Sequence, residues 1–173
     1  MRTLGETGRV VKKAAKWKLL LPLPAQEWFL MSDKKERMRA FAATFSDSGR
    51  WDPRYWGYFI TFNQGRYFEA HDVLEDLWLE CRKQRMDTFY KALIQLAGVF
   101  VHLQKQRLRP ARALMDLSQG YLHAHGTMVE GLSLGPVHAL LDQWRVRIAG
   151  LESLDFHQYP PPRLLMPEQG LDV

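Results

Sequence analysis

The stretch FYKALIQLAGVFVHL, residues 89–103, decides the fold class of this chain. Its apolar side chains cover most of the circumference of a helix with 3.6 residues per turn, so the stretch predicts a helix buried at the centre of a bundle. Asp87 precedes it at the position of an N-cap. The polar side chains fall in one narrow strip, which consists of Lys91, Gln95, His102 and Gln106.

The residues before this central helix predict a second helix over about residues 67–82, with one apolar and one charged face. We expect the charged face to meet solvent. The apolar face contains Tyr67, Ala70, Leu74, Leu77, Trp78 and Cys81. The charged face contains Glu69, Asp72, Asp76, Glu80 and Lys83.

Start and stop signals predict the other helices. Asp52 and Pro53 combine an N-cap with a proline in the first turn, so we expect the aromatic run 55–62 to be helical, with Gly65 as its end. The sequence therefore predicts an all-α fold, a compact bundle of five or six helices without a sheet. The remaining helical faces are Met38, Phe41, Ala42 and Phe45 after a cap at Ser32 or Asp33; Leu114, Leu117 and Tyr121 between Pro110 and Gly126; and Val137, Leu140, Leu141, Trp144 and Ile148 between Pro136 and Gly150.

Charge and composition divide the 173 residues into three parts. Residues 1–30 form a basic leader without a helical period, with six basic and two acidic residues. Met31 resembles a second translation start, so we expect the leader to be disordered or an artefact of the assigned start. Residues 31–150 are the helical bundle domain. Residues 151–173 contain Tyr-Pro-Pro-Pro at 159–162, which predicts an extended, proline-rich C-terminal tail over the bundle.

The composition argues against several classes of protein. Cys81 is the single cysteine, so the chain forms no internal disulfide, and we expect a cytoplasmic location. No apolar run approaches the roughly 20 residues of a transmembrane helix, and prolines interrupt the run 19–25, which argues against a signal peptide. Outside the leader the charges almost cancel, which disfavours a nucleic-acid partner without excluding it. Such a partner would meet the basic helix ends, Arg82, Lys83, Arg85, Lys105, Arg107, Arg109 and Arg112.

Four polar residues stand on or beside the apolar faces of the two central helices. His71 and Glu75 are four residues apart and therefore neighbours on one helix, with Trp78 about one turn further. Gln95 and His102 are seven residues apart, two turns along the polar strip. If a short turn joins the two helices antiparallel, we expect His71, Glu75, Gln95 and His102 to converge on one largely buried location.

Three interpretations of this cluster stay open. The four side chains can form a structural network, because buried polar groups need hydrogen-bond partners. His71, Glu75 and His102 can bind a divalent metal, since imidazole and carboxylate are ligands of zinc and non-haem iron, although the sharper His-Glu-x-x-His pattern is missing. The cluster can also bind a small ligand or act as an acid–base pair, with Trp78 as an apolar wall.

The remaining histidines and the cysteine give weaker signals. His123 and His125 are two residues apart and diverge on a helix, so they do not suggest a shared metal. His138 and His157 are isolated, and we expect them at the surface. Cys81 lies on an apolar face and is expected in the core.

Two blocks of this sequence resemble a known family. Residues 62–78 carry Phe-Asn-x-Gly-x-Tyr-x-Glu-x-His followed by Glu and Trp, and residues 89–97 carry Leu-Ile-Gln-x-Ala, with His102 after them. Over about residues 50–125 the chain resembles the family named domain of unknown function 309, found mainly in bacteria and archaea. The resemblance implies an all-helical, cytoplasmic protein and no established reaction. The motif positions are Asn63, Gly65, Tyr67, Glu69, His71, Glu75, Trp78, Gln95 and His102.

The sequence leaves three functions open, and whether the chain is an enzyme stays undecided. The first is a scaffold or small-ligand-binding protein built around the polar cluster. The second is a metal-dependent hydrolase, and the third is a nucleic-acid-associated protein. A divalent metal is the cofactor that the cluster suggests, and a homo-oligomer stays open. The cluster residues are His71, Glu75, Trp78, Gln95 and His102, with Asn63, Gly65, Tyr67 and Glu69 in support.

Overall fold

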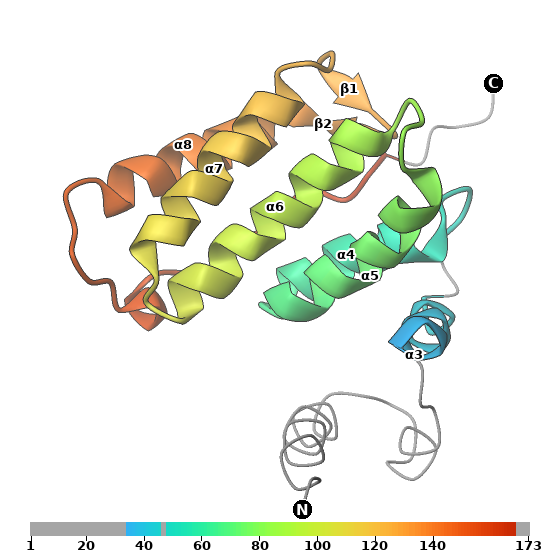
Figure 1. Cartoon of the computed structure of the whole chain (residues 1–173), viewed down its shortest axis with the longest axis horizontal. Helices are drawn as coiled ribbons and strands as arrows, with labels where there is room; N and C mark the ends of the chain where they lie inside the picture. Colours follow the sequence, from blue (N-terminus) through green and yellow to red (C-terminus); the bar gives the residue numbers. More distant parts are fainter. Residues whose placement is uncertain (1–33, 46–47, 169–173) are drawn as a thin grey trace, which may run out of the picture. The chain divides into compact units, whose positions relative to one another are not determined.

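The computed structural model describes residues 34–45 and 48–168, which form six α-helices, one two-stranded ladder and one short 3-10 helix (Figure 1). The predicted all-α bundle is therefore confirmed. The predicted leader, the start signal at Met31 and the caps at Ser32 and Asp33 lie outside the described residues. The elements are α3 (Lys34–Ala42), α4 (Pro53–Asn63), α5 (Tyr67–Cys81), α6 (Asp87–Gln104), α7 (Leu108–Leu122), β1 (Met128–Val129), β2 (Leu132–Ser133), α8 (Leu134–Ile148) and η1 (Phe156–Gln158).

The chain divides into two compact units, residues 1–41 and residues 42–173. The first unit contributes most of α3 to the described residues, and Phe45 lies beyond the end of that helix. The second unit contains the other helices and the C-terminal segment. None of the described helices is both long and apolar enough to span a bilayer.

The centre of the second unit is α6, which lies between α5 and α7 in Figure 1. Eleven of its eighteen residues are buried, as the apolar circumference of residues 89–103 predicts. The aromatic run on α4 is helical, because Asp52 accepts the N–H of Arg54 as an N-cap and Pro53 occupies the first turn. Gly65 has φ +76° and ends this segment as predicted.

A short antiparallel ladder corrects the expectation of a fold without a sheet. Met128 pairs with Ser133, and Val129 pairs with Leu132. The two residues of the turn, Glu130 and Gly131, both have positive φ, +46° and +70°, which is typical of a tight hairpin. A Cβ atom on Gly131 would lie 2.8 Å from the carbonyl oxygen of Glu168, so this position also requires glycine for the close approach of the C-terminal segment.

The buried face of α7 differs from the predicted one. Leu117 is 48% exposed, and Leu114 and Tyr121 are only half-buried. The buried face includes the polar residue Ser118, whose hydroxyl donates to the carbonyl of Ala92 at 2.9 Å. This interhelical bond depends on α6 and gives no apolar signal in the sequence of α7. The buried positions are Leu108, Ala111, Met115, Ser118 and Leu122.

The prolines that were expected to open α7 and α8 stand at the third residue of each helix. Pro110 follows the start of α7 at Leu108, and Pro136 follows the start of α8 at Leu134. The first turn has no intrahelical acceptor for its N–H groups, so a proline there removes no helix hydrogen bond. Helix α7 ends at Leu122, four residues before the predicted stop at Gly126.

Candidate functional site

Helix α5 brings together three side chains that can ligate a metal. Glu75 stands four residues after His71 and three after Asp72, so it is a neighbour of both on the helix surface, and His71 and Asp72 are in direct contact. Their candidate ligand atoms all lie within 4.8 Å of one another. No second group of three among residues 34–45 and 48–168 meets this criterion. The histidine and the two carboxylates therefore form the candidate site of the described chain.

The site is half open to solvent. The side chain of His71 is 31% exposed and that of Asp72 is 8% exposed, while Glu75 is half-buried. Nδ1 of His71 lies 3.2 Å from Oδ1 of Asp72. Burial of Asp72 holds one carboxylate in place, and the exposed side of His71 leaves room for a ligand to enter.

The acidic face of α5 is not the solvated face that the sequence suggested. Counted over the whole residue, Asp72 and Asp76 are only 6% and 7% exposed, because α4 packs against α5. Arg54 of α4 donates to Asp76 at 2.9 Å and to Glu80 at 2.8 Å. It also bonds the cap residue Asp52. This guanidinium neutralises the acidic groups along the seam between the two helices.

The charge state of Arg54 follows from these contacts. Burial by itself lowers the pKa of its guanidinium, but the hydrogen bonds that it donates to Asp52, Glu80 and Asp76 raise the pKa well above the ordinary value. Arg54 is therefore a permanent cation in a largely buried position. The acidic residues around it are part of the packing of α4 on α5, and they are distinct from the candidate ligands Asp72 and Glu75.

Helix α6 runs antiparallel to α5. The rings of Tyr67 and Phe100 have centroids 5.2 Å apart at one end, and Trp78 Nε1 lies 2.6 Å from Asp87 Oδ1 at the other. This register puts Gln95 at the level of His71. His102 lies seven residues further along α6, about 10 Å at 1.5 Å per residue. The convergence of all four predicted residues stays a prediction, and the compact group contains Asp72 in place of His102.

His102 has an environment of its own near the end of α6. It is half-buried, and its Nδ1 has no hydrogen-bond partner among the described residues. Burial, followed by the charges of Arg107 and Lys105, lowers the pKa of its imidazole. His102 is therefore a neutral imidazole at pH 7. Desolvation and two cations act on it, and no carboxylate shifts its pKa.

The supporting motif residues take part in the packing and hydrogen bonding of the fold. Asn63 bonds both backbone groups of Leu164, with its Nδ2 2.9 Å from the carbonyl oxygen and its Oδ1 2.7 Å from the amide nitrogen. Tyr67 is buried in the aromatic core. Glu69 is buried in the first turn of α5, where its charge meets the positive end of the helix dipole. Trp78 is half-buried, and its N–H is bonded to Asp87.

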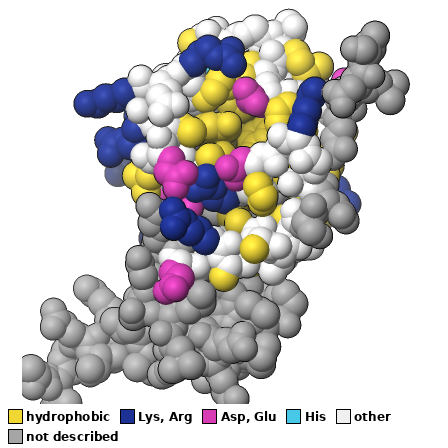
Figure 2. All heavy atoms as spheres, turned by 90° about the vertical axis from the view of Figure 1, so that its right-hand side faces the viewer, with side chains coloured by type: hydrophobic (Ala, Val, Ile, Leu, Met, Phe, Trp, Pro, Cys, Tyr) yellow, Lys and Arg dark blue, Asp and Glu magenta, His cyan; other side chains and the backbone are white. Residues whose placement is uncertain are grey.

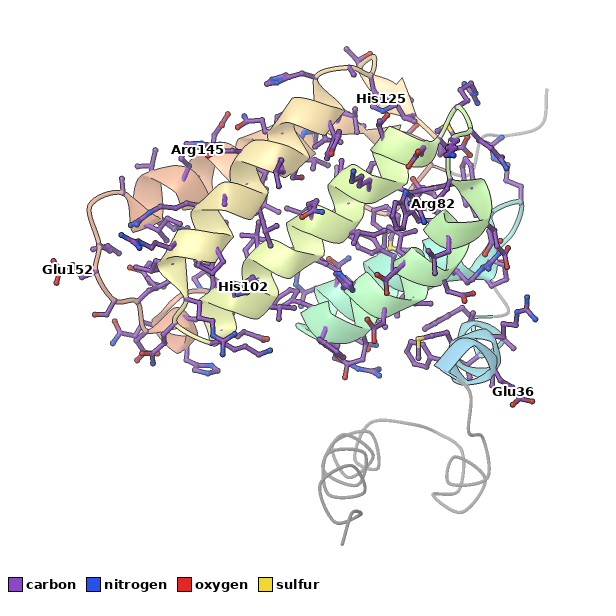
Figure 3. All side chains as sticks on the ribbon, in the orientation of Figure 1. Glu36, Arg82, His102, His125, Arg145 and Glu152 are labelled. Carbon is purple, nitrogen blue, oxygen red and sulfur yellow. The ribbon has the colours of Figure 1, made fainter. Side chains whose placement is uncertain are left out.

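The basic helix ends do not form one surface. Figure 3 shows Arg82 and His102 near opposite ends of α6, which spans about 27 Å for its eighteen residues. Lys105 lies over the ring of Phe68, and Arg112 donates to the carbonyls of Ile148 and Leu151. On the face in Figure 2, acidic and basic side chains are intermixed around hydrophobic ones. The two basic groups therefore lie near opposite ends of α6, and a nucleic-acid partner stays a prediction.

Cys81 ends α5 and is half-buried, so it is less enclosed than a core position. Burial raises the pKa of its thiol, and nearby Arg54 opposes this shift. A protonated thiol is a poor nucleophile and a poor metal ligand. Cys81 therefore adds nothing to the candidate site.

Comparison with known proteins supports the resemblance seen in the sequence. Residues 55–114 match the model of the family described as "Domain of unknown function (DUF309)". The chain is also 35% identical over 81 residues to the uncharacterized protein YpuF of Bacillus subtilis (strain 168), a match that covers 46% of this chain and 47% of that protein. The chain thus spans about half of this relative. No solved structure gives a significant match. The family match includes the whole of α5 and α6 and therefore every predicted cluster residue.

Proposed function

We propose that residues 55–114, which belong to the DUF309 family, form a small-ligand-binding bundle in which His71, Asp72 and Glu75 bind a divalent transition-metal ion. The observation that carries the proposal is the mutual approach of their ligand atoms to within 4.8 Å. A single ion with metal–ligand distances of about 2.0–2.2 Å can contact three atoms at such separations after small rotamer changes.

The donor set favours a particular class of ion. One imidazole nitrogen and two carboxylate oxygens suit Zn²⁺, Mn²⁺ or Fe²⁺ better than the soft ion Cu⁺, which prefers sulfur ligands. Two carboxylates also supply the negative charge that a buried cation requires. Because His71 is partly exposed, coordination positions remain for water or a small ligand. A site with three protein ligands and open positions is typical of functional rather than structural zinc.

Gln95 supports the site from the neighbouring helix. The antiparallel register of α5 and α6 supports this role, in which the amide of Gln95 hydrogen-bonds a ligating side chain or a bound ligand. Groups in such positions orient metal ligands, and their loss typically weakens metal binding by about 10–100-fold. This assigns Gln95 a positioning role and leaves His102 outside the proposed ligand set.

Metal titration of the full chain tests the proposal. Isothermal titration with Zn²⁺ and the visible absorption of Co²⁺ should both report one site, and Glu75→Gln should weaken binding at least about tenfold because it removes a charged ligand while keeping the side-chain shape. Glu152→Gln is the matched control, since Glu152 is exposed on the loop after α8 (Figure 3). Equal affinity of the two variants, or no saturable binding by the parent chain, would overturn the proposal.

Two other functions follow from different outcomes of the same experiment. If Glu75→Gln lowers stability and no metal binds, the cluster is a structural network and the domain is a scaffold. If metal binds and the loaded protein hydrolyses ester or phosphoester substrates, the open positions serve a metal-dependent hydrolase.

Salt-dependent retention on a polyanion column tests a nucleic-acid partner. The lone cysteine supports a reducing cytoplasm as the location.

A further inference from the structure

The segment after α8 lies on the bundle in the manner of a bound peptide. We call residues 151–168 the tail. In Figure 1 the tail leaves α8 at one end of the molecule and returns toward the β1–β2 hairpin at the other. Apart from η1 it has no regular secondary structure. Its buried side chains are separated by exposed ones, and they are Leu154, Phe156, Pro162, Leu164 and Pro167.

Asn63 holds the backbone of the tail at one residue. Its side-chain amide donates to the carbonyl oxygen of Leu164 at 2.9 Å and accepts the N–H of the same residue at 2.7 Å. One carboxamide thus satisfies the backbone donor and acceptor of Leu164, as a neighbouring strand would. Such main-chain bonds give affinity independent of side-chain identity, and pockets for the alternate side chains give specificity.

An aromatic pocket receives the first anchor of the tail. The ring of Phe156 stacks on Trp144 with centroids 5.3 Å apart and planes 25° apart, and it meets the edge of Tyr67 at 6.1 Å. Tyr159 contacts the same Trp144 at 5.7 Å and leads into the proline run 160–162. Aromatic-lined grooves are the usual receptors of extended proline-rich segments, because such segments lose little entropy on binding.

The far end of the tail is held by a glycine. The N–H of Glu168 donates to the carbonyl of Gly131 at 2.8 Å, at the place where a side chain on Gly131 would collide with Glu168. Between α8 and the first buried anchor, the tail is exposed at Leu151, Glu152 and Ser153. The anchors are therefore discrete and are joined to the bundle by an accessible connection.

We infer that this track, which we call the tail groove and define by Asn63, Tyr67, Phe100, Gly131 and Trp144, is a binding site for an extended, proline-containing peptide. Residues 154–168 of the chain itself occupy it as an exchangeable ligand. The required chemistry is an aromatic anchor, a proline run and a leucine whose backbone meets Asn63. The inference is independent of the proposed metal site, because His71, Asp72 and Glu75 take no part in it.

The tail and the bundle can be separated without shortening the protein. A protease recognition sequence is inserted between Glu152 and Ser153 of the full chain, the folded protein is cut there, and size exclusion reports whether the fragment stays bound. A fluorescent synthetic peptide of residues 154–168 then replaces it. We expect the fragment to remain bound after cutting, to exchange with the peptide, and to leave the helical circular dichroism of the bundle unchanged.

Substitutions in the peptide provide the main comparison, because they cannot impair folding of the bundle. Phe156→Ala and Leu164→Ala peptides should each bind at least about tenfold more weakly, the factor that corresponds to about 1.4 kcal/mol, whereas Arg163→Ala, at an exposed position, should bind as the parent does. In the bundle, Asn63→Ala should weaken binding and the neighbouring Gln64→Ala should not.

Three results would overturn the inference. They are loss of the helical signal when the fragment leaves, failure of the emptied groove to rebind the peptide, and equal affinity of the Phe156→Ala and Arg163→Ala peptides. Loss of the helical signal would show that the tail is an integral part of the fold. The uncut chain could also form concentration-dependent dimers that dissociate when the peptide is added. This result would support the inference, with a second copy as the source of the occupying segment.

Discussion

Nε1 of Trp78 donates a hydrogen bond of 2.6 Å to Oδ1 of Asp87, which joins the last turn of α5 to the first turn of α6. The other carboxylate oxygen of Asp87 accepts the backbone N–H of Lys83 at 2.8 Å. These two bonds, the one from Lys83 first, lower the pKa of Asp87. The guanidinium of Arg82 lies 5.0 Å from the centre of the Trp78 ring. Asp87 therefore stabilises the turn.

These contacts correct one expectation. The N-cap of α6 is Met86, and no side chain caps that helix, so the prediction of Asp87 as its N-cap is wrong. The N–H of Trp78 fastens the two helices, and the role of its ring as an apolar wall of a ligand site stays a prediction. The sequence contained the necessary signal, because an acidic residue at the start of a helix can also receive N–H groups from the preceding turn.

Trp78→Phe should lower the melting temperature by roughly 2–4 °C, the shift that loss of about one hydrogen bond causes in a domain of this size. Trp51→Phe is the matched control, since Nε1 of Trp51 has no hydrogen-bond partner among residues 34–45 and 48–168. Differential scanning fluorimetry at pH 7 measures both variants. Equal shifts would mean that the Trp78 hydrogen bond contributes nothing beyond ring packing.

The helices could be predicted because their signals are local. The cap at Asp52, the positive φ at Gly65 and the apolar circumference of residues 89–103 all depend on neighbours within a few residues. The buried face of each helix was harder to predict. Asp76 is buried because Arg54 from another helix neutralises it, and no periodicity within α5 can show that partner.

Arg54→Met should destabilise the fold by about 3 kcal/mol, because it leaves the buried carboxylate of Asp76 without its cation. Arg145→Met is the matched control: Arg145 pairs with Asp116 at the surface, where side chains are 42% and 64% exposed, and should cost at most about 1 kcal/mol. Urea unfolding at pH 7 gives both values. Adding Asp76→Leu to Arg54→Met should recover part of the loss, and failure to do so would contradict a buried ion pair.

The candidate site shows the same limit of sequence reasoning. His71 and Glu75 were found by their spacing, which a helix makes local. Asp72 was missed because its position on the wheel suggested a solvated face, although it is 6% exposed. Spacing could not decide the place of His102 either, since that depends on the register between α5 and α6.

Zinc should raise the melting temperature of the full chain. At a free concentration of about 100 times Kd, a ligand that binds only the folded state adds about 2.7 kcal/mol, or roughly 5–10 °C for a domain of this size. The increase should disappear with a chelator and be about half as large or less in Glu75→Gln, while Glu152→Gln keeps it. An equal rise in all variants would point to nonspecific zinc binding.

His123 and His138 connect the end of α7 to α8 through stacked rings, with centroids 5.0 Å and planes 15° apart. His138 is half-buried rather than at the surface as expected, and its Nδ1 has no hydrogen-bond partner among the described residues. Burial first, and then the neighbouring His123, lower the pKa of His138, while Asp142 opposes this shift. The folded state therefore disfavours the charged form of His138.

The sign of the pH dependence follows from this lowered pKa. Below about pH 6.5 the unfolded chain binds a proton at His138 that the folded chain still excludes, so stability falls as the pH decreases from 7 toward 5. In His138→Gln no imidazole can titrate, and the melting temperature should decrease less steeply over this range than in the parent. His157→Gln, at an exposed position, should keep the parental slope. Thermal melts at half-unit pH intervals decide the matter, because identical slopes for the parent and His138→Gln would show that His138 titrates alike in both states.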